Sequence, residues 1–191
     1  CIIQDKYGFI WVGTNYGLNR FDGYNFSTYL CNPADTTTIQ DNDIVKLYPY
    51  SKEFLFVGTN RGLYKYSYLA NSFQHIVLEK KDEKIRVSSL IEDGKHNLLI
   101  GTAGYGAYRL DMTTGKVTRL SRKSANSVDN FFAILFFDAE GYLWQANHTK
   151  VLRKYKYNGK SIRLVSVYEP KDLFGIRKLY ATDKKGFFVA H

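Results

Sequence analysis

The sequence predicts an all-β protein, a β-propeller built from four-stranded blades, and three observations lead to this prediction. A short motif, Val12-Gly13-Thr14, returns as Val57-Gly58-Thr59 and Ile100-Gly101-Thr102, and in altered form as Gln145-Ala146-Asn147. Successive copies, including a fifth marked by Asp183-x-x-Gly186, start 45, 43, 45 and 45 residues apart, which is typical of a repeat architecture. Each copy contains short β-rich runs joined by tight turns, and four-stranded units at this period indicate propeller blades.

The first copy shows what one blade contains. Four strands are expected in it, at 1–3, 9–12, 18–21 and 24–30. The turn Asp5-x-x-Gly8 separates the first two strands, and the hairpin signal Asp22-Gly23 separates the last two. The run Phe9–Val12 is apolar on both faces, so we expect the second strand to be buried between neighbouring blades.

The rest of the chain is divided in phase with this copy. The predicted blades are 1–42, 43–88, 89–130 and 131–175, and 176–191 forms an incomplete fifth. No helical period and no low-complexity linker interrupts them, so residues 1–191 are expected to form a single partial propeller. Because propellers close by pairing their first and last blades, we expect the molecule to continue beyond both ends, or two copies to cover each other's open faces as a homodimer.

Composition supports stacked sheets and leaves the compartment open. The chain has 16 Tyr, 13 Phe and 2 Trp, which suits sheets packed through aromatic side chains. Cys1 and Cys31 are its only cysteines. On the first and fourth strands of one blade they would be about 14 Å apart, too far for a disulfide.

The net charge of +9 raises the question of an acidic partner, such as a nucleic acid, an anionic glycan or a membrane face. The basic residues are scattered, however, and several recur at like positions of the third strand: Arg20, Lys65, Arg109 and Arg153-Lys154. We interpret them as a solvated strand face repeated blade by blade, and a functional basic surface is the alternative.

Enzymatic and metal chemistry find little support. The recurrent aspartates Asp5, Asp93, Asp138 and Asp183 lie one per blade, and the prediction is that each caps its own turn. Trp11 and Trp144 are expected to pack between blades. No Cys/His spacing resembles a zinc site, and no catalytic residue, metal or cofactor is predicted. Separately, no apolar run approaches the roughly 20 residues of a membrane span.

A binding site is expected on the face that carries the longer loops. The turns between the second and third strands lie there, and their candidate ligand-binding residues are Asn15, Tyr16, Asn60, Arg61, Tyr105, Asn147 and His148. Aromatic rings beside amide and guanidinium donors would suit a carbohydrate, and Arg61 and His148 would favour a sulfate or carboxylate on it. The alternative is that these residues serve the backbone geometry of the turns.

The repeat resembles that of the two-component regulator propeller family. The consensus sequence of that repeat is approximately D-x-x-G-x-[IL]-W-[IV]-G-T followed by x-x-G-[LI]-x-[RK]-[FY]. Residues 2–26 match it nearly throughout. The second and third copies match the Gly-Thr core and the third strand. The fourth keeps Gly141–Trp144 but has Gln145-Ala146-Asn147 in place of the core.

The resemblance implies a place in a larger signalling protein. Such repeats build the periplasmic sensor portion of inner-membrane hybrid two-component histidine kinases, usually with seven-bladed propellers. It further implies an oligosaccharide ligand, possibly anionic, whose binding regulates transcription of glycan-utilisation genes. The other partners would be the remaining blades and domains of the same chain, with no direct nucleic-acid contact by this segment. The kinase would lie outside these residues. The alternative is a protein-interaction propeller without a signalling role.

Overall fold

The structure is a computed structural model that describes residues 1–79, 84–121, 131–132, 134–146, 151–169, 178–181 and 187–190. The described residues form strands, turns and loops and contain no helix. They divide into two compact units, Cys1–Leu90 and Ile91–His191. None of the described residues forms a helix long and apolar enough to cross a membrane.

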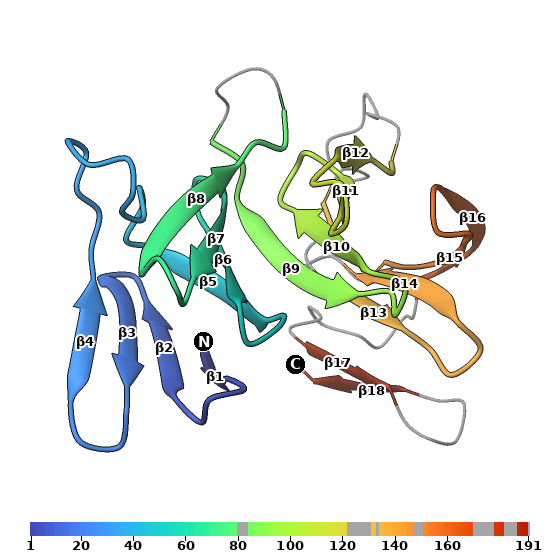
Figure 1. Ribbon diagram of the computed structural model, residues 1–191. Helices are drawn as coiled ribbons and strands as arrows, with labels where there is room; N and C mark the ends of the chain where they lie inside the picture. Colours follow the sequence, from blue (N-terminus) through green and yellow to red (C-terminus); the bar gives the residue numbers. More distant parts are fainter. Residues whose placement is uncertain are drawn as a thin grey trace. The chain divides into compact units, whose positions relative to one another are not determined.

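The strands form five antiparallel sheets, each made of strands that follow one another in the sequence (Figure 1). The first sheet contains β1 (Ile2–Gln4), β2 (Ile10–Thr14), β3 (Gly17–Phe21) and β4 (Phe26–Tyr29). The second contains β5 (Ile44–Pro49), β6 (Phe54–Thr59), β7 (Leu63–Ser67) and β8 (Ser72–Ile76). The third contains β9 (Val87–Glu92), β10 (Asn97–Thr102), β11 (Ala107–Asp111) and β12 (Val117–Arg119).

The fourth sheet contains β13 (Ile134–Phe137), β14 (Tyr142–Ala146), β15 (Leu152–Tyr157) and β16 (Ile162–Tyr168). The fifth pairs β17 (Lys178–Ala181) with β18 (Phe187–Ala190). The first strand of the third sheet begins at Val87, two residues before the predicted blade boundary at Ser89. The blade boundaries themselves stay a prediction.

The repeated Gly-Thr pair has a local and a packing role. Thr14 Oγ1 donates to Gly17 O and accepts from the amide of Tyr16, both at 3.0 Å, so the hydroxyl holds the turn after the second strand. Thr59 makes the same two contacts in the second sheet. The glycine before it allows the next sheet to approach, because a Cβ on Gly13 would lie 2.5 Å from Ile44 Cγ2.

Aromatic residues form a connected cluster within the core of the unit Cys1–Leu90, beside aliphatic side chains. Trp11 is fully buried, stacks on Tyr29 of its own sheet and meets Tyr66 of the second sheet edge-on, with ring centroids 5.2 Å apart. The expected packing of Trp11 between blades is therefore confirmed. In the unit Ile91–His191, Trp144 stacks on Phe136 and Tyr168, which belong to its own sheet.

Burial of the second strand varies from sheet to sheet. Strand β10 is buried throughout, and β6 is buried in all but its first residue, as predicted. In β2, however, Ile10 and Val12 stay partly exposed, so only one face of the first sheet is covered by the described residues. Ile2 and Phe26, 70% and 65% exposed, belong to the same sheet.

The recurrent basic residues do not form a solvated strand face, so that interpretation is corrected. Arg20, Lys65, Arg109 and Lys154 are all half-buried. In three sheets the cation lies over the aromatic ring that begins the second strand: Arg20 over Phe9 at 4.8 Å, Lys65 over Phe54 at 4.6 Å, and Lys154 over Tyr142 at 4.0 Å. These are cation–π contacts within each blade.

Candidate functional site

The three recurrent aspartates that the structure describes, Asp5, Asp93 and Asp138, each organise their own turn. Asp5 Oδ1 accepts the amides of Tyr7 and Phe9 at 2.9 and 3.0 Å, and Asp5 Oδ2 accepts Trp11 Nε1 at 2.6 Å. The prediction that these aspartates cap their own backbone is thus confirmed for Asp5, and the indole bond extends it. Asp183 lies outside the described residues.

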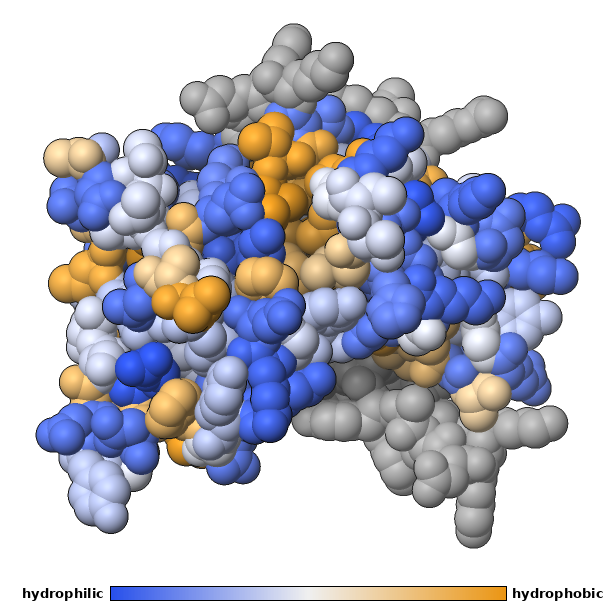
Figure 2. Space-filling view, viewed as in Figure 1, coloured by the Kyte–Doolittle hydropathy of each residue, from blue (hydrophilic) through white to orange (hydrophobic). Residues whose placement is uncertain are grey.

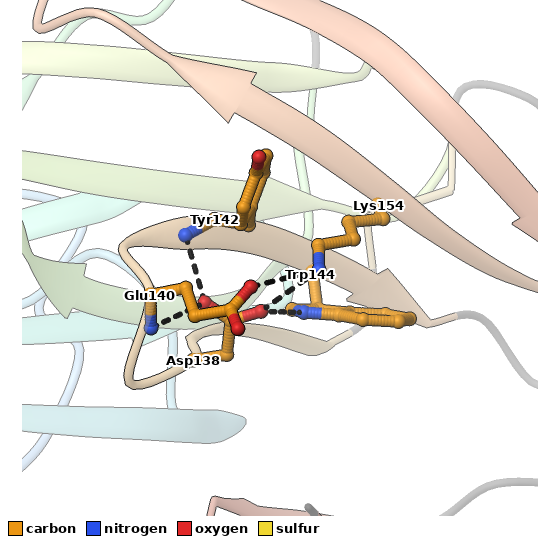
Figure 3. A network of polar contacts seen from close by, with 5 residues as sticks. All are labelled: Asp138, Glu140, Tyr142, Trp144 and Lys154. Atoms are coloured by element: carbon orange, nitrogen blue, oxygen red, sulfur yellow. Dashed lines mark hydrogen bonds and ion pairs between the residues drawn. The ribbon is translucent and has the colours of Figure 1, made fainter. Parts of the chain in front are cut away.

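The fourth copy repeats this network, which Figure 3 shows. Asp138 accepts the amides of Glu140 and Tyr142 and, at 2.7 Å, Nε1 of Trp144. The ammonium of Lys154 lies 3.5 Å from Asp138 Oδ2 and 3.7 Å from Glu140 Oε2. A turn, the second strand and the third strand are therefore held by one carboxylate.

The same carboxylates also join neighbouring blades. Tyr68, just after β7, donates its hydroxyl to Asp5 Oδ2 at 2.8 Å. Tyr157, at the end of β15, donates to Asp93 Oδ2 at the same distance. The two tyrosines occupy equivalent places, 63 and 64 residues after their aspartates. We call each such pair an Asp–Tyr latch.

Burial and hydrogen bonding shift the titration of the latch residues. Burial raises the pKa of the Tyr157 hydroxyl, and its bond to Asp93 raises it further. Burial raises the pKa of Asp93 as well, but the hydrogen bonds from Asn97, Lys95 and Tyr157 outweigh it and leave the pKa below its usual value. At Asp138, burial is likewise outweighed, mainly by the hydrogen bonds from Trp144 and Tyr142.

Because the pKa values of Asp93 and Asp138 are lowered in the folded state, we expect the protein to lose stability in acid. A carboxyl whose folded-state pKa is lowered stabilises the fold above its unfolded-state pKa of about 4, and that contribution is lost as the pH falls through the folded-state value. The urea midpoint should therefore fall below about pH 4, and Asp138→Asn should flatten the decline. A midpoint that is constant from neutral pH to strong acid would contradict this expectation.

A groove of about 670 Å³ opens between the first two sheets of the unit Cys1–Leu90, at the end that carries the tight turns. It lies beside the latch of Asp5 and Tyr68. Its lining residues come from the turns and strand ends of both sheets: Tyr7, Phe9, Arg20, Lys52, Glu53, Phe54, Ser67, Tyr68 and Leu69. Aromatic side chains thus stand beside two cations and one carboxylate.

Arg20 is the innermost cation of the groove. Its guanidinium lies over Phe9, and one nitrogen donates to the Tyr66 hydroxyl at 3.4 Å. Its Nε is buried and has no hydrogen-bond partner among the described residues. Tyr7 is fixed at the rim, because its hydroxyl donates to the carbonyl of Lys52 at 2.8 Å while 52% of the residue stays exposed.

The five predicted site residues that the structure describes lie elsewhere, on the turns at the opposite end of the strands. Asn15 and Tyr16 follow β2, and Tyr16 is 81% exposed. Arg61 follows β6 and is exposed. Tyr105 lies in the other unit, half-buried, and its carbonyl accepts Arg119. Asn147 and His148 lie outside the described residues. The role of all seven stays a prediction.

Asn60 alone among these residues is part of a side-chain network. Its amide nitrogen donates to Asp43, and its amide oxygen accepts from Arg86. Asp43 comes just before β5 and Arg86 just before β9, so the cluster joins the second sheet to the start of the third. Among the described residues, no group of His, Cys, Asp and Glu is arranged to hold a metal ion.

Sequence reasoning missed the groove and the latches. The latch leaves a sequence signal, because Asp5 with Tyr68 and Asp93 with Tyr157 repeat one spacing. In each latch, the aspartate of one copy bonds the tyrosine of the next copy. The second copy has Tyr50 in place of the aspartate, and the third copy has Met112 in place of the tyrosine that would pair with it, so the two residue types change together. The groove gives no such signal, since its lining residues are spread over five turns and strand ends.

Sequence comparison identifies the repeat. The model of the family described as two component regulator propeller matches residues 1–16. A stretch of 38 residues is 58% identical to "Histidine kinase P4" of Formosa agariphila. This stretch covers 20% of this chain and 3% of that protein.

Structural comparison identifies the fold over nearly the whole chain. One similar structure is the extracellular domain of BT3049 from B. thetaiotaomicron, described as a hybrid two component system. It has a TM-score of 0.80 and 25% identity over 98% of this chain and 26% of that one. The extracellular domain of BT4673 from B. thetaiotaomicron matches with a TM-score of 0.63 and 17% identity over 99% of this chain and 36% of that one.

The WD40 propeller domain of Doa1 has a TM-score of 0.68 at 10% identity over 98% of this chain and 58% of that one, which shows the fold alone. This chain spans about a quarter of the length of the extracellular domain of BT3049. The predicted fold class is confirmed, since strands β1 to β16 form consecutive four-stranded antiparallel sheets and the WD40 propeller of Doa1 aligns over 98% of this chain. This chain is a β-propeller segment whose first repeat matches the two component regulator propeller model and whose fold is similar to that of the extracellular domain of BT3049.

Proposed function

We propose that this segment belongs to the extracytoplasmic sensor region of a hybrid two-component histidine kinase. The similarity to the extracellular domain of BT3049 over 98% of the chain carries this proposal. The propeller match at residues 1–16 and the local identity to a histidine kinase support it. The segment itself would be the non-catalytic input part, with the kinase elsewhere in the parent protein and an anchor in the inner membrane.

The signal we propose is an oligosaccharide, and the response is transcription of glycan-utilisation genes. Support comes from the surface chemistry of the segment rather than from its comparisons. The groove of the unit Cys1–Leu90 combines aromatic walls with charged groups, which is the mixture that binding sites for polar ring compounds use. The face shown in Figure 2 is largely hydrophilic and carries scattered apolar patches.

The reading frame on either side of the encoding gene segment tests the sensor proposal. We expect further copies of the repeat, then an apolar span of about 20 residues, and then the phosphoacceptor and nucleotide-binding motifs of a histidine kinase. A frame that closes soon after the fifth copy, with no apolar span on either side, would refute a membrane kinase. A soluble binding propeller would then be the better description.

A further inference from the structure

We propose that the groove between the first two sheets of the unit Cys1–Leu90 binds an acidic sugar, with Arg20 and Lys52 facing its acid group and Glu53 facing its hydroxyls. The proposal deepens the sensor function and rests on it for its biological meaning. It gives the place and the charge of the ligand, and both can be tested by binding alone.

The size and shape of the groove suit a ligand of one or a few rings. Its volume of about 670 Å³ lies within the range of small-molecule sites, about 300–1,000 Å³. Tyr7 offers an exposed ring held in one orientation by its hydrogen bond to the backbone of Lys52. Because the ring is already fixed, stacking a sugar ring on it costs little additional side-chain entropy.

The charges of the groove point to an acid group. Arg20 has a buried Nε without a hydrogen-bond partner among the described residues. For the ammonium of Lys52, at the exposed rim, no hydrogen bond or ion pair to a described residue is found. Two cations against the single carboxylate of Glu53 leave a net positive groove, which attracts an anion.

Glu53 further restricts the kind of ligand that would suit the groove. Its carboxylate likewise makes no hydrogen bond or ion pair within the described part of the chain, although the backbone of Glu53 is bonded to Tyr68. An ionised carboxylate only accepts hydrogen bonds, so its natural partner is a ligand that brings donors. A carboxylate or sulfate on a hydroxylated ring satisfies Arg20, Lys52 and Glu53 together, whereas a plain aromatic acid leaves Glu53 without a partner.

The equivalent position in the other unit shows why this groove keeps a cation available. Arg109 is the counterpart of Arg20, and its Nε is likewise buried without a hydrogen-bond partner among the described residues, but Asn97 stands where Phe9 would. Arg109 instead donates to the carbonyl of Gly159 in the neighbouring sheet at 2.8 Å. Arg20 reaches the second sheet through the longer bond of 3.4 Å to the Tyr66 hydroxyl, while its guanidinium lies over Phe9 of its own blade.

A ligand in the groove would also contact the residues that hold the two blades together. Tyr68 lines the groove and forms the latch with Asp5. Arg20 lines it and contacts the ring of Trp11 at 5.7 Å and the hydroxyl of Tyr66. Binding can therefore alter the packing between blades, which a sensor requires.

Isothermal titration calorimetry of the protein with digalacturonate, a neutral galactose disaccharide and benzoate tests the proposal. Digalacturonate should bind, and the neutral disaccharide and benzoate should each bind at least about tenfold more weakly, since each lacks one part of the recognised chemistry. No digalacturonate binding at millimolar concentration would overturn the proposal, and so would equal binding of either comparison compound.

Matched variants locate the site. Lys52→Ala and Tyr7→Ala should each weaken digalacturonate binding about tenfold or more. Arg61→Ala and Tyr16→Ala remove an exposed cation and an exposed tyrosine at the other end of the strands, and should leave the affinity unchanged. The opposite pattern would overturn the groove and favour the loop face. Urea midpoints of all four variants show that each remains folded, and the reading-frame test of the sensor function is unaffected by either result.

Discussion

Replacing Asp5 with alanine should lower the free energy of unfolding by about 3–5 kcal/mol, because one buried carboxylate serves four donors. Asp5 is 7% exposed and accepts two backbone amides, the indole of Trp11 and the hydroxyl of Tyr68. Alanine leaves all four without an acceptor in a place that water reaches poorly. Urea unfolding followed by tryptophan fluorescence measures the loss.

Two further variants separate the latch from the turn. Tyr68→Phe removes only the hydroxyl that crosses between blades and should cost about 1–2 kcal/mol. In the double variant with Asp5→Ala, the tyrosine change should add little, since its acceptor is already gone. Fully additive effects would show that the bond between Tyr68 and Asp5 contributes nothing to stability.

Gly58→Ala should destabilise the protein by about 1–3 kcal/mol through overpacking. A Cβ at this position would lie 2.7 Å from Cγ1 and 3.0 Å from Cβ of Val87, at the start of the next blade's first strand. Both atoms belong to a branched side chain held close to its own backbone, so neither can move without shifting β9. Thermal unfolding of the variant beside the parent protein is the measurement.

Gly62→Ala is the matched control. Its added Cβ would also meet an atom at 2.7 Å, but that atom is Nε2 of His75, at the far end of a side chain. The imidazole can turn away, so we expect a cost of at most about 1 kcal/mol. An equal or larger loss at Gly62 would mean that the close approach at Gly58 is not what fixes the glycine of the Gly-Thr motif.

The fold could be predicted because its motif repeats at a regular spacing along the sequence. Trp11, Gly58 and Thr102 each stand at a fixed place in a copy, and the strands of one blade are consecutive in the sequence, so a local pattern determines a local sheet. The structure adds the physical reason for the motif. Its glycine lets the next blade approach, and its threonine closes the following turn.

The contacts of individual side chains could not be predicted in the same way. The interpretation of Arg20 and Lys65 as solvated was wrong because their partners, Phe9 and Phe54, lie on a neighbouring strand of the same sheet at a distance in sequence that no turn or helix period marks. The groove depends on which side chains two separate turns place side by side. That arrangement is a property of packed sheets and not of one strand.

The spacing of the latch also has a consequence for how the chain acquires its structure during synthesis. Each sheet needs only neighbouring strands, so it can form soon after its own residues leave the ribosome, in the order of the sequence. Asp5, however, receives its tyrosine 63 residues later. The nascent first blade therefore holds a carboxylate that lacks one of its donors until β7 of the second blade has been made. Completion of the first blade then depends on translation of the second, and completion of the third on translation of the fourth, which favours ordered growth from the N-terminal end.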